Sequence, residues 1–236
     1  MSESAFLQVR DLCVSFGLSQ VLFDVTLAAP RHGAVAVLGR NGAGKSTLLK
    51  TIVGELVPRS GSIAFNLQDI TLLPTERRIH TGLGYLPQEH SVFNRLSVRE
   101  NLEVGALTNR DRSAVGQVLA CFPKLGRRLD QPAGTLSGGE RKMLAIGRAI
   151  LSGPKLLLLD EPTEGVWIGV VEEIAECLRD LVKDIAVVIV EQHLELALGL
   201  ADYVYVLDRG RVALEGRSDA VRKDPRLLEL LAPLSR

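Results

Sequence analysis

One stretch of the chain has the residue types and the spacing to hold a polyphosphate. Residues 39–46 read Gly-Arg-Asn-Gly-Ala-Gly-Lys-Ser and fit the pattern G-x-x-x-x-G-K-S/T in full. The glycines let backbone N–H groups wrap closely around phosphate oxygens. Lys45 is predicted to reach the β and γ phosphates, and the Ser46 hydroxyl to take a place on Mg²⁺. The residues predicted to bind nucleotide here are Gly39, Arg40, Asn41, Gly42, Ala43, Gly44, Lys45, Ser46 and Thr47.

Two adjacent carboxylates follow an apolar run and are suited to hydrolytic chemistry. Asp160 and Glu161 come directly after Leu156–Leu159. The carboxyl end of a parallel strand is where α/β proteins bind their ligands. Asp160 is predicted to hold Mg²⁺, directly or through water, and Glu161 to orient or deprotonate an attacking water. Strands often end in solvated acids, so this interpretation depends on the phosphate loop upstream.

The elements that must position these motifs predict an α/β fold. Leu156–Leu159 and Ala186–Val190 are apolar without alternation, as in central strands of a parallel sheet covered on both faces. A strand at Ala34–Leu38 leads into the phosphate loop, and a helix begins near Lys45. The strands before Phe65 have fewer helices between them and are predicted to form an antiparallel side sheet. The other predicted strands are Leu7–Val14, Ser62–Phe65, Tyr203–Leu207 and Arg211–Leu214.

The stretch from about residue 91 to 128 is predicted to begin a mainly helical lobe inserted into this core. A capping-box pattern opens at Ser97, just before apolar positions at helical spacing. A second helical pattern runs over 112–122 and is predicted to end at Pro123. The predicted organisation is a single domain over 1–236, with a core at 1–90 and 153–236 and a helical lobe at 91–152.

Composition excludes several classes of protein. Of the 236 residues, 28 are Lys or Arg and 28 are Asp or Glu, so no general affinity for nucleic acid is predicted. The cysteines at 13, 121 and 177 match no metal-ligand spacing and are interpreted as reduced thiols. The N-terminus has no secretion signal, and no apolar run approaches the roughly 20 residues that span a bilayer. The sequence therefore predicts a cytoplasmic chain.

A further motif, Leu-Ser-Gly-Gly-Glu at residues 136–140, lies 20 positions before Asp160. A hydroxyl, two small residues and a helix N-terminus again make an anion site. Together with the phosphate loop, this sequence resembles the ABC ATPases, whose diagnostic motif opens a helix. The resemblance implies a P-loop NTPase fold with a RecA-like core and a helical lobe that ends in the signature helix. It also implies that Ser137, Gly138, Gly139 and Glu140 of one subunit close over the γ-phosphate bound to another.

The resemblance covers essentially the whole chain and assigns further residues. Gln88 matches the family's Q-loop, which contacts Mg²⁺ and senses the membrane partner, and His193 matches the switch histidine that touches the γ-phosphate. Phe16 stands where the family usually has a tyrosine that stacks on adenine; a place in the core is the alternative. Trp167 departs from the family, because it stands where the D-loop often has an aspartate. It is predicted either at a dimer interface or packed inside its own subunit.

The function that the resemblance implies is that of the ATP-binding and ATP-hydrolysing subunit of an ABC transporter. ATP and Mg²⁺ are the implied ligands. Permease subunits and a second ATPase subunit, identical or homologous, are the implied partners, with a periplasmic solute-binding protein acting indirectly. The implied location is peripheral, on the inner face of the cell membrane. No nucleic acid partner is expected.

Three stretches resemble the ATPases of importers for branched-chain amino acids, amides and urea: Met143–Ala149, Asp160–Gly165 and Val190–Gln192. Residues 84–89 and 92–98 also resemble ATPases that power lipopolysaccharide extraction. The importer is the preferred interpretation and the exporter the alternative. Neither the solute nor the choice between a homodimer and a heterodimer follows from the sequence.

Two rival functions fit the sequence less well. A soluble ABC ATPase of DNA repair inserts a long coiled coil between the phosphate loop and the signature. Lys45 and Ser137 are only 92 positions apart, which leaves no room for one. Ribosome-acting members carry two ATPase domains in one chain, and this chain has one. The presence of Glu161 and His193 argues against a scaffold that binds nucleotide without hydrolysis.

Overall fold

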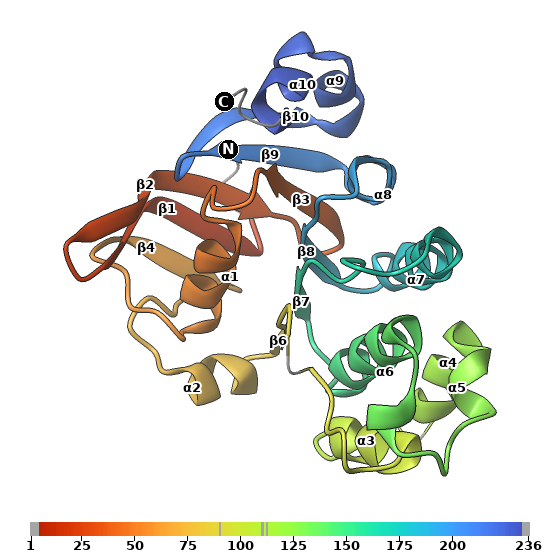
Figure 1. The fold of residues 1–236 in the computed structure, drawn as a ribbon. Helices are drawn as coiled ribbons and strands as arrows, with labels where there is room; N and C mark the ends of the chain where they lie inside the picture. Colours follow the sequence, from red (N-terminus) through yellow and green to blue (C-terminus); the bar gives the residue numbers. More distant parts are fainter. Residues whose placement is uncertain (1–4, 90, 110, 112, 233–236) are drawn as a thin grey trace.

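The computed structural model describes residues 5–89, 91–109, 111 and 113–232 (Figure 1). Its centre is a six-stranded sheet in which β9, β3, β8, β7 and β6 run parallel and β10 pairs antiparallel at one edge. In spatial order the strands are β10 (Arg211–Arg217), β9 (Tyr203–Asp208), β3 (Gly33–Gly39), β8 (Ala186–Val190), β7 (Leu156–Asp160) and β6 (Leu83–Leu86). The predicted parallel central sheet is confirmed.

A second, antiparallel sheet stands beside the first, as predicted. Its four strands are β2 (Ser19–Ala29), β1 (Leu7–Phe16), β4 (Ser60–Phe65) and β5 (Gln68–Asp69), in that order. The sequence did not predict β2, β6 or the helix α2 (Thr75–His80). In the described ranges, no helix combines the length and the apolar composition that a membrane crossing requires.

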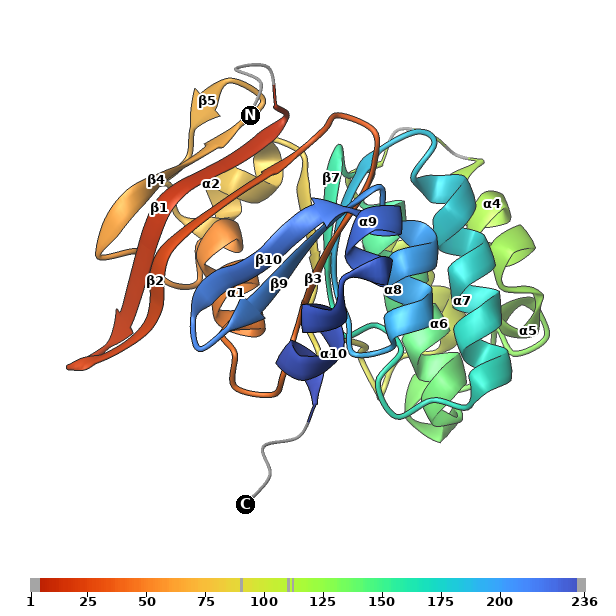
Figure 2. The same ribbon diagram turned by 90° about the horizontal axis from the view of Figure 1, so that it is seen from above.

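The six-stranded sheet separates two hydrophobic cores, and Figure 2 shows the elements that lie on its two sides. On one side lie α1 (Lys45–Val53) and the antiparallel sheet; on the other lie α6 (Gly138–Leu151), α7 (Ile168–Leu181) and α8 (Leu194–Leu200). Successive strand residues point to opposite faces. Leu156 and Leu158 of β7 therefore enter the first core, and Leu157 and Leu159 enter the second. This two-sided burial explains why the strand is apolar at every position.

The helical lobe lies apart from the antiparallel sheet and contains α3 to α6 (Figure 1). Its elements are α3 (Val98–Ala106), α4 (Ala114–Cys121), α5 (Pro123–Gly126), a 3₁₀ turn at Ala133–Thr135, and α6. Ser97 caps α3 in the predicted capping box with Glu100. The predicted end of the second helix needs a correction: α4 ends at Cys121, and Pro123 opens α5 at a position that needs no N–H donor. Arg112, the predicted start of that helix, lies outside the described residues.

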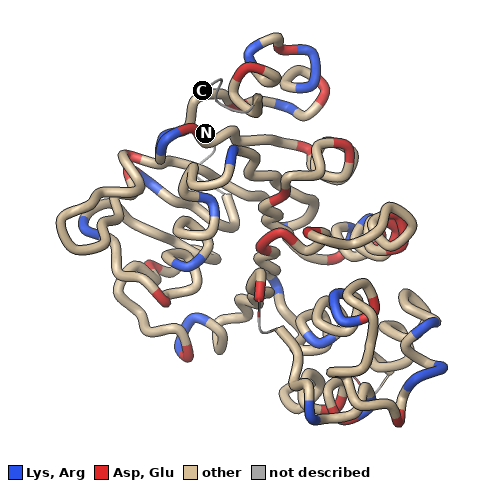
Figure 3. The backbone as a smooth tube through the Cα atoms, viewed as in Figure 1, with Lys and Arg blue, Asp and Glu red and all other residues tan. Residues whose placement is uncertain are grey.

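Two short helices at the C-terminal end, α9 (Ser218–Lys223) and α10 (Pro225–Leu231), pack near β9 and β10. Basic and acidic residues occur together in the core and in the lobe (Figure 3). This mixture agrees with the charge balance of the sequence.

Candidate active site

The phosphate loop joins β3 to α1 at the carboxyl edge of the parallel sheet. Gly44 precedes α1 with φ 104°, a left-handed conformation that side chains rarely adopt. A Cβ at this position would also lie 2.6 Å from Cδ2 of Leu22, so the turn requires glycine. No side chain caps α1 in the described structure. The first N–H groups of this helix are therefore left to an external acceptor such as a phosphate.

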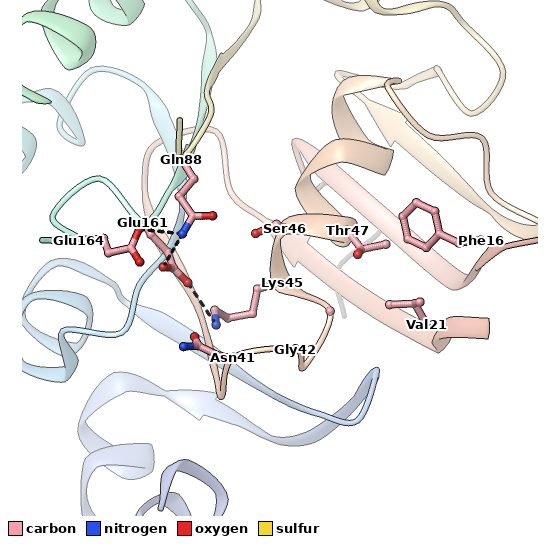
Figure 4. Close-up of a pocket in the computed structure, with 11 residues that line it drawn as sticks. Phe16, Val21, Asn41, Gly42, Lys45, Ser46, Thr47, Gln88, Glu161 and Glu164 are labelled. Carbon is pink, nitrogen blue, oxygen red and sulfur yellow. Dashed lines mark hydrogen bonds and ion pairs between the residues drawn. The ribbon is translucent and has the colours of Figure 1, made fainter. Parts of the chain in front are cut away.

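Lys45 is the buried cation of the loop, with 4% of its surface exposed. Its Nζ donates to the carbonyl oxygens of Gly39 at 2.8 Å and Arg40 at 3.2 Å. The same Nζ lies 3.3 Å from Oε1 of Glu161, as the close-up shows (Figure 4). A buried ammonium is stable only with such partners, and a phosphate is a further partner of the right charge.

Ser46 and Asp160 meet although 114 positions separate them. The Ser46 hydroxyl donates to Oδ1 of Asp160 at 3.0 Å, and Asp160 is 1% exposed. Burial raises the pKa of Asp160; the Ser46 hydrogen bond opposes this, and the negative charge of Glu161 adds to it. A hydroxyl and a carboxylate are oxygen ligands of the kind that Mg²⁺ takes alongside substrate phosphates and water. The residues present therefore fit a magnesium ion, although the described residues contain no group of three or more His, Cys, Asp or Glu that could hold one without phosphate.

Glu161 lies at the centre of the site and is 4% exposed. Its Oε2 accepts hydrogen bonds from Nε2 of Gln192 at 2.7 Å and from Nε2 of Gln88 at 3.3 Å. Its backbone has φ 49°, a left-handed conformation that is unusual outside glycine and turns the chain sharply after β7. The contacts of the carboxylate, together with the bond from Glu161 N to the Val190 carbonyl at 2.9 Å, hold that turn.

Gln88 connects the site to the helical lobe. Its Nε2 donates to Oε2 of Glu164 at 2.7 Å as well as to Glu161 (Figure 4). Lys142, on α6, donates to the carbonyl oxygens of Gln88 at 3.1 Å and Glu161 at 3.2 Å. One lysine of the lobe thus holds the backbone of both loops. Sequence reasoning did not single out Glu164 or Lys142 as site residues, because neither belongs to a motif that predicts this contact.

These side chains surround a pocket of about 360 Å³. Its lining residues are Phe16, Val21, Asn41, Gly42, Gly44, Lys45, Ser46, Thr47, Gln88, Glu161 and Glu164. Phe16 stands beyond Thr47, away from the carboxylates (Figure 4), and is 51% exposed. The alternative that Phe16 belongs to the hydrophobic core is therefore wrong. The pocket has an aromatic end and an end with a lysine and carboxylates, as a nucleotide requires.

The signature residues do not line this pocket. Ser137 caps α6, its Oγ accepting from Glu140 N at 3.2 Å, while Oε2 of Glu140 accepts from Ser137 N at 3.0 Å. Arg128 donates to Oε1 of Glu140 at 2.6 Å. Burial raises the pKa of Glu140, but the hydrogen bonds from Ser137 and the Arg128 guanidinium outweigh it, so the net pKa is lowered. Ser137 and Gly138 are exposed, which leaves this helix start open to a partner outside the chain.

The prediction that His193 touches the γ-phosphate stays a prediction. His193 precedes α8, and its Nδ1 accepts the backbone N–H of Leu196 at 3.3 Å. His193 does not line the pocket, whereas the preceding residue, Gln192, contacts Glu161. Glu191, 2% exposed, accepts from the backbone N–H groups of both residues.

Trp167 is the residue before α7 and is 75% exposed. The alternative that it packs inside its own subunit is therefore wrong. A large exposed aromatic at this place favours the other alternative, a surface covered by a second chain.

Comparison with known families and proteins agrees with the site. A family model described as ABC transporter matches residues 22–164. The high-affinity branched-chain amino acid transport ATP-binding protein BraG of Pseudomonas aeruginosa is 41% identical over 216 residues, covering 90% of this chain and 93% of that protein. The probable branched-chain amino acid transport ATP-binding protein LivF of Archaeoglobus fulgidus is 39% identical, covering 84% and 86%. The lipopolysaccharide export system ATP-binding protein LptB of Acidithiobacillus ferridurans is 36% identical, covering 94% of each.

Solved structures give the same result for the fold. A nucleotide-free ATP-binding cassette from an ABC transporter matches with a TM-score of 0.84 at 27% identity, covering 97% of this chain and 99% of that one. The ADP conformation of MJ1267, an ATP-binding cassette of an ABC transporter, matches with a TM-score of 0.82 at 29% identity, covering 96% and 98%.

Proposed function

Because this chain belongs to the ABC transporter family of ATP-binding proteins, we propose that it hydrolyses ATP in the pocket between Phe16 and Glu161. Phe16 stacks on the adenine at the aromatic end of the pocket. The backbone N–H groups of residues 39–47 and the N-terminus of α1 bind the phosphates, with Lys45 between the β and γ groups. The observation that carries this proposal is the 3.3 Å distance between Lys45 Nζ and Glu161 Oε1. It brings the cation that would bind the phosphates next to the carboxylate that would act as the base.

Ser46, Gln88 and Asp160 are the residues that would hold Mg²⁺. The ion would supply positive charge to the β and γ phosphate oxygens. The donor set supports this assignment: Asp160 and Ser46 are already joined by a 3.0 Å hydrogen bond at the phosphate loop.

Glu161 acts as the general base. It accepts a proton from the water whose oxygen attacks the γ-phosphorus, while the bond from that phosphorus to the β–γ bridging oxygen breaks. ADP and inorganic phosphate are the products. Gln88 and Gln192, which donate to Glu161 Oε2, keep the carboxylate in place.

The second ATPase subunit completes the site. Ser137–Glu140 do not line the pocket of their own chain, and Ser137 and Gly138, at the start of their helix, are exposed. In a dimer, identical or heteromeric, these residues close over the γ-phosphate held by the other subunit. Trp167, exposed beside the loop that follows Glu161, lies at the interface of the two chains.

A groove beside β6 receives the permease. It has a volume of about 390 Å³ and runs between the core and the lobe, which we place at 91–152. Ile79 and Phe93 are partly exposed hydrophobic residues of its lining, and the guanidinium of Arg148 lies 4.4 Å from the centre of the Phe93 ring. A helix from a membrane subunit that enters this groove lies next to the segment containing Gln88, so its movement reaches Glu161.

The transported solute is a branched-chain amino acid or a related small polar compound, imported with the help of a periplasmic solute-binding protein. The two most identical relatives named above, at 41% and 39%, carry branched-chain amino acid transport in their names, and the lipopolysaccharide relative follows at 36%. The chain then works at the inner face of the cell membrane. Lipopolysaccharide export is the alternative.

Glu161→Gln tests the catalytic assignment. It removes the base but keeps the size of the side chain, so turnover falls at least about 100-fold while ATP still binds. Glu172→Gln, the same change at an exposed position of α7, is the matched control. Normal hydrolysis by the Glu161 variant would contradict the proposal. Mass spectrometry of membrane proteins that co-purify with the tagged chain then tests the transporter class: amino-acid permeases support import, and lipopolysaccharide permeases support the alternative.

A further inference from the structure

Two of the three cysteines lie where α4, in the helical lobe, meets α7. Cys121 is the last residue of α4, and Cys177 lies in the C-terminal half of α7. The two helices are in contact (Figure 1), and both cysteines pack in the same hydrophobic core. The Cys177 thiol is within hydrogen-bonding range of Cys121. A buried cysteine by itself is ordinary core packing, whereas two thiols in contact can form a bond.

An ion pair holds the same two segments together. Lys124 of α5, which begins just after α4, pairs with Glu173 of α7. Glu173 precedes Cys177 by four positions, and residues four apart lie on one face of a helix. Because Cys121 precedes Lys124 by three positions, the ion pair brings the end of α4 to the face of α7 that carries Cys177. The packing of the helices therefore places the two thiols together, independently of their own contact.

The two cysteines belong to different parts of the protein. Cys121 lies in the lobe, which we place at 91–152, and α7 joins β7 to β8, two central strands of the core. The contact between α7 and the lobe extends to the signature residues, because Val170 in the first turn of α7 lies against Gly139. A Cβ at Gly139 would be only 2.8 Å from Cγ2 of Val170. A covalent bond between α4 and α7 would therefore fix the signature residues relative to the core.

The two thiols differ in their access to a reagent. Cys121 is partly exposed, whereas Cys177 is 4% exposed. Burial raises the pKa of Cys177, and the hydrogen bond and the charge of Cys121 raise it further. Cys177 therefore stays protonated at neutral pH and is covered by protein, so a small oxidant meets Cys121 first. This is the arrangement of an attacking thiol with a resolving thiol beside it.

We propose that Cys121 and Cys177 form a redox-sensitive disulfide that tethers the helical lobe to the core. The oxidant is a small-molecule disulfide. The Cys121 thiolate attacks one of its sulfurs, which gives a mixed disulfide and releases one thiolate. Cys177 then attacks the Cys121 sulfur and releases the second thiolate. The two cysteine protons end on the two released thiols, so the cysteine pair is oxidised by two electrons and the small disulfide is reduced.

The consequence for turnover rests on the proposed function. The signature residues close over the γ-phosphate in the other subunit only if the lobe can move to meet it. In the reduced protein, the contacts between α7 and the lobe can break and form again. The Lys124–Glu173 ion pair is partly exposed, and such pairs contribute little to stability. A disulfide holds the lobe in one position, so it should slow hydrolysis while leaving the phosphate loop able to bind nucleotide.

Oxidised glutathione, a small-molecule disulfide, tests the proposal on the full-length chain, with peptides mapped by mass spectrometry without reduction. Wild type should give a linked pair of peptides that contain Cys121 and Cys177. Cys177→Ala should stop at the mixed disulfide and keep glutathione on Cys121, and Cys121→Ala should carry none on Cys177. Cys13→Ala, the matched control in β1, should form the linked pair as wild type does. Melting under reducing conditions checks that each variant is folded.

ATP hydrolysis and ADP binding are measured on the same samples. Oxidation should lower kcat of wild type and of Cys13→Ala at least about fivefold, with the ADP Kd within about twofold, and dithiothreitol should restore it. Cys121→Ala and Cys177→Ala should lose less than about twofold, because neither can form the tether. No linked pair in folded wild type, or a linked pair without loss of kcat, overturns the proposal. A reduced wild type that does not hydrolyse ATP contradicts the proposed function instead, and the peptide map still decides whether the disulfide forms.

Discussion

Arg78 is a fully buried cation outside the pocket, and its removal should be costly. It is 1% exposed and lies on α2, behind the C-terminal end of α1. Its guanidinium donates to four backbone carbonyls: Leu73 at 2.7 Å, and Thr51, Ile52 and Thr71 at 2.8 Å each. Two of these carbonyls belong to the last turn of α1, where a positive charge also suits the helix dipole.

The cost of Arg78→Met can be worked out from these contacts. The Thr51 carbonyl keeps a second donor, the Gly54 N–H at 3.3 Å. The other three carbonyls lose the only donor given above, and each hydrogen bond to a charged group contributes about 1 kcal/mol or more to stability. Methionine retains most of the volume, and burying a thioether costs less than burying a charge. The free energy of unfolding should therefore fall by about 3 kcal/mol, which lowers the melting temperature by about 6–12 °C in a chain of this size.

Urea titration and thermal melting measure this change, with Arg77→Met as the matched control. Arg77 is the exposed neighbour on the same helix, so the same substitution there should change the free energy of unfolding by less than about 0.5 kcal/mol. If Arg78→Met lost less than about 1 kcal/mol, the four hydrogen bonds would contribute little beyond what water supplies to the carbonyls, and the reasoning would be refuted.

Three further predictions concern the phosphate loop, the signature helix and the turn between β9 and β10. Lys45→Ala should weaken ADP binding at least about tenfold in a fluorescence titration, because the phosphates lose their buried cation. A carboxylate whose pKa is lowered by folding stabilises the protein above its unfolded pKa, and the gain is lost as pH falls through the folded pKa. In urea titrations, the stability difference between wild type and Glu140→Gln should therefore stay constant near pH 7 and shrink as the pH falls below the ordinary glutamate pKa of 4.5. Gly210→Ala should lose more than about 2 kcal/mol of stability, because its Cβ would overlap the Val21 carbonyl oxygen, whereas Gly126→Ala, with open space, should not.

Much of the central sheet could be predicted because its strands carry a strong signal. Ala186–Val190 was predicted with the bounds that the structure gives, and all five residues are buried. β2 was missed because its alternation breaks at Asp24, where φ is 53° and the pairing with β1 shifts register nearby. β6 was missed because it has four residues, one of them Gly84, at the edge of the sheet. Such strands are specified by their neighbours more than by their own sequence.

The motifs of the site were found for a related reason: each is a contiguous run whose chemistry is local. The phosphate loop needs its glycines and its lysine within eight positions, and the sequence displays them. Contacts between different motifs cannot be recognised in the same way, because the residues that meet are far apart in the sequence. Lys142 reaches the carbonyls of Gln88 and Glu161 across three separate segments, and no spacing along the chain predicts that meeting.

The loop after β8 has contacts that the sequence could not predict, for a physical reason. A one-residue difference after a strand sends a side chain to the opposite side of the chain, so the identity of the facing residue depends on the turn and not on residue type. Here the turn is set by Glu191, whose carboxylate accepts both backbone N–H groups and also holds Thr163. Thr163 lies two positions after Glu161, which is itself held at φ 49°. The left-handed turn at Glu161 and the buried carboxylate of Glu191 are therefore parts of one linked structure. A substitution at Glu191 would disturb the aim of Glu161 and of Gln192 together, although Glu191 itself does not line the pocket.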